Sequence, residues 1–88
     1  MNLENIRENI NSIDKELVAL IEQRMTLVSQ VAAVKKETSK AIFDKEREEA
    51  ILARVADQVA NKELEPFIVA IFVDIMKVSR VYQEEKLK

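Results

Sequence analysis

One arginine interrupts an otherwise apolar series in the N-terminal part of the chain. Apolar residues recur every three or four positions as far as Leu20, and the next position in the series is Arg24. Because a guanidinium group stays protonated in proteins, a buried Arg24 needs an anion beside it. An Asp or Glu of the same protein could pair with it, or the side chain could extend to water. The functional alternative is a pocket that binds an anionic ligand at Arg24.

The three-four spacing of this apolar series predicts a helix. Two further cations belong to the same helix. Lys35 follows Arg24 by 11 residues, which is about 20° around an ideal helix and roughly 16 Å along it. Long cationic side chains at that spacing can converge on one small dianion. Arg7 precedes Arg24 by 17 residues, roughly 25 Å along the helix, so it could reach only a partner's pocket in an antiparallel dimer. The alternative for Arg7 is an ordinary solvated position.

Two groups of polar residues follow in the rest of the chain. Asp44, Arg47 and Glu48 have i, i+3, i+4 spacing and therefore share one face of a helix. Ser79 and Gln83 have i, i+4 spacing beside another apolar stripe. A helix cap with a solvated charged turn, and a merely tolerated serine, are the non-functional explanations. Together with the N-terminal cations, these residues could surround the interior of a helical bundle.

The apolar residues around these positions have the spacing of amphipathic helices. They predict a helix from Leu3 to about Glu37, a loop at residues 38–41, and a second helix from Asp44 to about Ala60. Pro66 suits the first turn of a third helix. Residues 67–73 could form a strand by propensity, but the helical spacing continues beyond them. We therefore expect an all-α fold with one long helix and two shorter ones.

The predicted first helix is too long for a compact chain of this size. It would extend about 50 Å, whereas a globule of 88 residues has a diameter of roughly 30 Å. Its apolar stripe runs over the whole length, so the overhanging half needs another surface to cover it. A second copy of the chain is the simplest partner, because most soluble oligomers are two-fold homodimers.

Composition limits the possible chemistry. A net charge of −2 argues against binding to nucleic acid or to an anionic membrane. The chain has no Cys, His or Gly, which removes Cys-type zinc sites, the commonest metal ligand and a glycine-rich phosphate loop. We expect no metal and no cofactor. We find no signal peptide, and the longest uninterrupted apolar run, residues 67–73, is too short to span a bilayer. The expectation is one cytoplasmic domain over residues 1–88.

Taken together, the polar positions resemble those of the all-helical chorismate mutases. The resemblance covers residues 3–83 and departs at Phe43, where several members have a basic residue. It implies a homodimer of interlocked three-helix chains with two active sites. The motifs that carry it are Ile6-Arg7-Glu8-Asn9-Ile10, Ile13-Asp14, Leu20-Ile21-Glu22-Gln23-Arg24, Val31 to Lys35, Phe43-Asp44-Lys45-Glu46-Arg47-Glu48 and Ser79-Arg80-Val81-Tyr82-Gln83.

The resemblance also implies a role for each candidate residue. Arg24 and the partner's Arg7 would bind the two carboxylates of chorismate, and Ser79 and Arg47 would complete the carboxylate pocket. Lys35 would contact a carboxylate and the ether oxygen, and Gln83 would donate a hydrogen bond to the same oxygen. Glu48, with the Asp44 backbone, would hold the ring hydroxyl.

The implied activity is that of an isomerase, the [3,3] rearrangement of chorismate to prephenate in phenylalanine and tyrosine biosynthesis. No proton moves in this reaction and no covalent intermediate forms, which agrees with the absence of His and Cys. An isochorismate pyruvate-lyase of the same fold is one alternative, although the Asp44 to Glu48 motif favours the mutase. A non-enzymatic helical dimer or adaptor is another. A larger enzyme of the pathway is a possible further partner.

Overall fold

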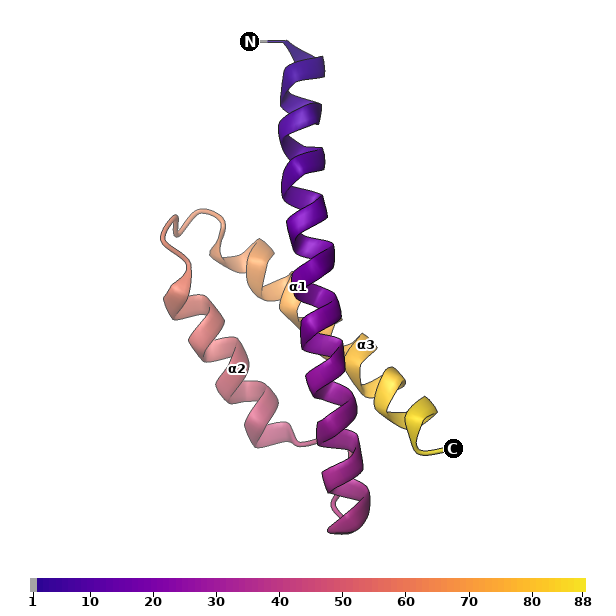
Figure 1. Ribbon diagram of the computed structural model, residues 1–88. Helices are drawn as coiled ribbons and strands as arrows, with labels where there is room; N and C mark the ends of the chain where they lie inside the picture. The colour runs from indigo at the N-terminus through magenta and orange to yellow at the C-terminus, as the bar shows by residue number, and fades with distance from the viewer. Residues whose placement is uncertain (1) are drawn as a thin grey trace.

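A computed structural model describes residues 2–88 and has three helices and, within those residues, no strand (Figure 1). The helices are α1 (Leu3–Glu37), α2 (Lys45–Gln58) and α3 (Glu65–Lys86). The predicted all-α fold, with one long helix and two shorter ones, is confirmed. Residues 67–73 are helical, so their hydrophobic spacing outweighs their strand propensity.

Side-chain caps fix where α1 and α2 begin. The Asn2 side chain accepts a hydrogen bond from the Asn5 amide at 2.8 Å, and Asp44 accepts one from the Arg47 amide at 3.0 Å. α2 ends at Gln58, two residues before the expected end, because the backbone at Val59 is extended and its side chain is buried.

α1 ends in a Schellman motif, which satisfies carbonyls that the helix leaves free. The amide of Lys40 donates to the Lys35 carbonyl at 2.8 Å, and that of Ser39 donates to the Lys36 carbonyl at 3.3 Å. Ser39 has a φ of 57°, in the left-handed region that the motif requires and that glycine usually occupies. The turn sends the chain back toward α2.

α3 packs against both other helices and holds the fold together. Figure 1 shows that α2 and α3 lie beside the C-terminal half of α1, while its N-terminal half extends beyond them. The radius of gyration is 15.9 Å, compared with about 12 Å for a compact chain of this length. The overhang predicted from the length of α1 is therefore present.

Few apolar side chains are buried within the described chain, residues 2–88. The buried apolar residues are Ala32, Val55, Val59 and Met76. Many large apolar residues of α1 are exposed, including Ile10, Leu17 and Leu20. The accessible surface is 7191 Å², about 1,900 Å² more than the roughly 5,300 Å² expected of a 10.1 kDa globular monomer. The excess is of the size that one subunit buries in an obligate dimer.

By length and composition alone, α1 could also cross a membrane, because it contains an 18-residue stretch with a mean hydropathy of 1.3. Charged residues interrupt its apolar residues, so this part of the sequence contains no long uninterrupted apolar run. Glu22 and Arg24 lie near the middle of the apolar region of the helix. An arginine at the centre of a bilayer costs about 2.5 to 3.5 kcal/mol. Only 6% of that stretch is buried within the structure, so α2 and α3 leave most of its apolar surface uncovered.

Replacing Ser39 with glycine should stabilise the protein. For Ser39→Gly we expect the free energy of unfolding to rise by roughly 0.5 to 1 kcal/mol, because relief of left-handed strain exceeds the added freedom of the unfolded chain. Urea unfolding at fixed protein concentration measures the change. Ser29→Gly, in the interior of α1, is the control and should lower stability. Equal losses in the two variants would contradict the assignment of strain to Ser39.

Candidate active site

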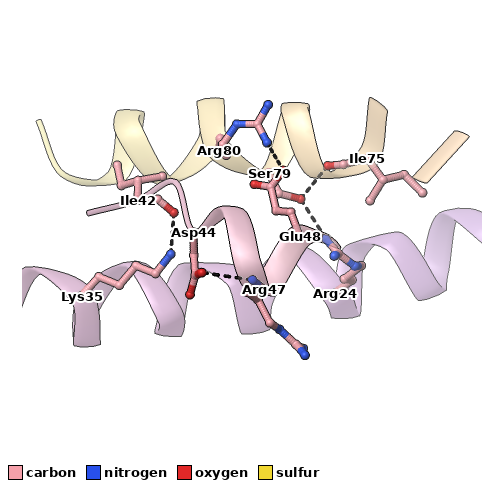
Figure 2. A network of polar contacts seen from close by, with 9 residues as sticks. All are labelled: Arg24, Lys35, Ile42, Asp44, Arg47, Glu48, Ile75, Ser79 and Arg80. Atoms are coloured by element: carbon pink, nitrogen blue, oxygen red, sulfur yellow. Dashed lines mark hydrogen bonds and ion pairs between the residues drawn. The ribbon is translucent and has the colours of Figure 1, made fainter. Parts of the chain in front are cut away.

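A cavity of about 260 Å³ lies between the three helices and the loop that precedes α2. Its wall includes seven of the eight residues that the sequence analysis selected, from all three helices: Arg24, Lys35, Asp44, Arg47, Glu48, Ser79 and Gln83. The eighth, Arg7, does not line the cavity and lies on the overhanging part of α1. Figure 2 shows the polar contacts that orient most of these side chains.

Arg24 is held by a hydroxyl group. Its Nη1 donates to Ser79 Oγ at 2.8 Å, and Ser79 Oγ donates to the Ile75 carbonyl at 2.7 Å (Figure 2). Among residues 2–88, no carboxylate lies within ion-pair distance of Arg24. The buried ion pair considered in the sequence analysis is therefore not formed within the chain. The positive charge of Arg24 remains available to a bound anion.

The second cation of α1 is attached to the loop. Lys35 Nζ donates to the Ile42 carbonyl at 2.5 Å, so the ammonium group is held at one end of the cavity (Figure 2). An ammonium group has three protons, and this contact occupies one of them. Lys35 can therefore keep its loop contact and still donate to a ligand. Periodicity in the sequence did not reveal the Ile42 carbonyl, because it is a backbone group of an irregular segment.

The acidic residues of the cavity are already engaged. The Asp44 carboxylate caps α2, as predicted, and Glu48 forms an ion pair with Arg80 of α3. Arg80 was not among the predicted site residues, although it follows Ser79 and lies three residues before Gln83 on the same helix. That i, i+3 spacing was the available signal.

Gln83 presents an unpaired amide oxygen. The residue is only 7% exposed, and its Oε1 has no hydrogen-bond partner within residues 2–88. Buried polar atoms normally have a partner, because leaving one unpaired costs about 1 to 3 kcal/mol. An unpaired buried group on a cavity wall is typical of a binding site rather than of a structural core.

The charges on the cavity wall favour a dianion. Four cations (Arg24, Lys35, Arg47 and Arg80) and two carboxylates (Asp44 and Glu48) line it, a formal charge of +2. The whole chain has a net charge of −2, so positive charge is concentrated at this site. Opposite signs at a cavity and over the rest of the surface steer anions toward the cavity.

Comparison with known proteins identifies the family. The family described as chorismate mutase type II matches residues 6–84. The chain belongs to this family. The match confirms the resemblance inferred from the sequence. A solved chorismate mutase from Helicobacter pylori, determined in complex with prephenate, is similar to this family member, with a TM-score of 0.86 and 29% identity over 97% of this chain and 92% of that one.

Two curated relatives of this chorismate mutase family member are much longer proteins. A bifunctional chorismate mutase/prephenate dehydratase from Buchnera aphidicola is 35% identical over 83 residues, which is 93% of this chain and 22% of the relative. The T-protein of Haemophilus influenzae is 44% identical over 50 residues, 57% of this chain and 13% of the relative. The similarity thus covers only a small part of each relative.

Removing the Ser79 hydroxyl should show how much its contact with Arg24 stabilises the fold. Ser79 and Ser29 each donate to a carbonyl of their own helix at 2.7 Å, but only Ser79 also accepts from an arginine. Ser29→Ala should gain a few tenths of a kcal/mol from helix propensity. Ser79→Ala should lose about 1 kcal/mol, because Arg24 loses its acceptor. Equal gains in urea unfolding would contradict the role given to Ser79.

Proposed function

We propose that this chain is a chorismate mutase, an isomerase that converts chorismate to prephenate without a cofactor. The observation that carries the proposal is the cavity with a formal charge of +2, formed by all three helices of a member of this family. Chorismate is a dianion, and the reaction needs a compact conformation with stabilisation of charge on the breaking ether bond. A site of fixed cations and one buried amide meets both needs.

Arg24 is the carboxylate anchor in this proposal. No carboxylate of the described chain, residues 2–88, neutralises it, and the Ser79 hydroxyl fixes its orientation. Arg47 lines the same cavity and adds charge for the carboxylates. Because a guanidinium group can bind a carboxylate through two parallel hydrogen bonds, these contacts orient the substrate as well as bind it. Holding a flexible substrate in its reactive geometry can contribute several kcal/mol to the rate.

Lys35 and Gln83 are the proposed donors to the ether oxygen. Negative charge develops on that oxygen as the bond breaks, so donors already in place stabilise the transition state more than the ground state. By analogy with oxyanion holes, each could contribute roughly 3 kcal/mol. The burial of Gln83 and the loop contact of Lys35 support this role, since both restrict motion. Glu48, with the Asp44 backbone, is proposed to hold the ring hydroxyl.

The proposal includes a cytoplasmic homodimer in which the partner's Arg7 completes each pocket. The exposed apolar stripe of α1 and the excess accessible surface support a large interface. Arg24 and Arg47 also border a second hollow of about 250 Å³, which adjoins the first. An antiparallel α1 of a second copy could cover both. Since one relative is named as bifunctional with prephenate dehydratase, we include association with a larger pathway enzyme in the proposal.

Loss of chorismate absorbance with purified protein tests the function. We expect Arg24→Met to lower kcat/KM at least about 100-fold, or roughly 3 kcal/mol, because a charged contact to the substrate is lost. The variant should keep its helical circular dichroism and stability, since replacing a partly buried charge with an apolar group can be neutral. Lys45→Met removes an exposed cation outside the cavity and should retain full activity.

The identity of the product separates the remaining alternatives. Prephenate, identified by chromatography and mass, supports the mutase. Release of pyruvate from isochorismate without chorismate turnover would indicate a lyase. No turnover of either compound would leave a non-enzymatic helical protein and contradict the proposal.

Mixing two inactive variants tests the shared site. Arg7→Ala and Lys35→Ala should each be nearly inactive as homodimers, because each removes a cation from both pockets. Refolded together in equal amounts, about half of the dimers should be mixed, with one intact pocket in each. Activity should therefore return to about one quarter of the wild-type value. A mixture that stays inactive, with mixed dimers confirmed by mass, would refute the role of the partner's Arg7.

A further inference from the structure

Arg80 connects three separate parts of the cavity wall. It lies on α3, pairs with Glu48 of α2, and places its guanidinium carbon 5.2 Å from the centroid of the Phe43 ring in the loop before α2. Both charged side chains are partly shielded from water, with 29% of Arg80 and 20% of Glu48 exposed. Figure 2 shows the contact between Arg80 and Glu48 near that between Arg24 and Ser79.

We infer that Arg80 is a positioning residue that holds Glu48 in the orientation required to accept a hydrogen bond from a ring hydroxyl of the substrate. This inference rests on the proposed function. Glu48 lies in the first turn of α2, and several rotatable bonds separate its carboxylate from the backbone. A cation fixed on the neighbouring helix restricts those bonds.

Arg80 is itself fixed, which allows it to orient another group. The face of an aromatic ring attracts a guanidinium group, which can also stack on it because it is planar. The contacts with Phe43 and with Glu48 therefore limit the positions of the guanidinium. The same stacking attaches Arg80 to the loop, directly after the Ile42 carbonyl that accepts from Lys35.

Arg80 also balances the charge of Glu48. An unpaired carboxylate on the wall would repel the carboxylates of a dianionic substrate. Without Arg80, the formal charge of the lining residues would fall from +2 to +1. Because Arg80 balances its charge, the Glu48 carboxylate can accept a hydrogen bond from the substrate hydroxyl in a pocket that also binds a dianion. Salt screens the repulsion between the Glu48 carboxylate and the substrate more than it weakens the direct contact between Arg80 and Glu48. An assay at high salt therefore separates the effect of Arg80 on charge from its effect on the orientation of Glu48.

A double-mutant cycle in kcat/KM tests the inference. The variants are Arg80→Met, Glu48→Gln and the combination, assayed with chorismate at about 0.5 M salt, where the screening length is about 4 Å. We expect Arg80→Met to lower kcat/KM about tenfold in the wild-type background and less than about twofold in the Glu48→Gln background. Arg80→Lys, which keeps the charge but not the planar group, should recover part of the loss.

The outcomes distinguish the inference from the function on which it rests. A wild-type protein without turnover overturns the proposed function, and this inference with it. Wild-type turnover with equal losses from Arg80→Met in both backgrounds overturns the inference alone, because Arg80 would then act independently of Glu48. Full activity of Glu48→Gln overturns it as well. Circular dichroism verifies folding, and Arg80→Lys replaces Arg80→Met in the cycle if the latter does not fold.

Discussion

The contact between Arg24 and Ser79 joins the two helices on which the cavity depends. A charged residue occupies a position in the apolar stripe of α1, and α3 receives it with a hydroxyl at 2.8 Å instead of a carboxylate. A carboxylate would have neutralised the guanidinium and left no charge for a ligand. A hydroxyl satisfies a donor without removing the charge. The same contact therefore joins α3 to α1 and leaves the positive charge of Arg24 unneutralised in the cavity.

The other charged residues of the cavity are arranged around this unneutralised cation. Glu48 is engaged by Arg80, while the Asp44 carboxylate caps α2. Backbone and side-chain contacts thus use the acidic groups and leave the positive charge of α1 free. Ion pairs elsewhere, such as Lys45 with Glu49, lie on exposed surface and contribute little. Which charged groups pair with one another, rather than how many line the cavity, therefore determines which charges a ligand can contact.

Much of this structure could be predicted from the sequence, because it follows from periodicity. The bounds of α1 agree with the prediction, and the polar residues at helical spacing do converge, with the exception of Arg7. The end of α2 was misplaced, because burial of Val59 depends on tertiary packing. The pairing of Arg80 with Glu48 could not be predicted, since it depends on how α3 lies against α2.

Lys35 is bonded to the following loop twice. Its backbone carbonyl accepts from the Lys40 amide at 2.8 Å, and its ammonium group donates to the Ile42 carbonyl at 2.5 Å. These two hydrogen bonds, both made by Lys35, hold residues 35–42 in a closed loop. Adding or deleting a residue within 38–41 would displace Ile42 by roughly 3 Å, which exceeds the tolerance of a hydrogen bond. The number of residues in this loop is thus more constrained than their identity, and homologues that keep the contact should vary here by substitution rather than by insertion.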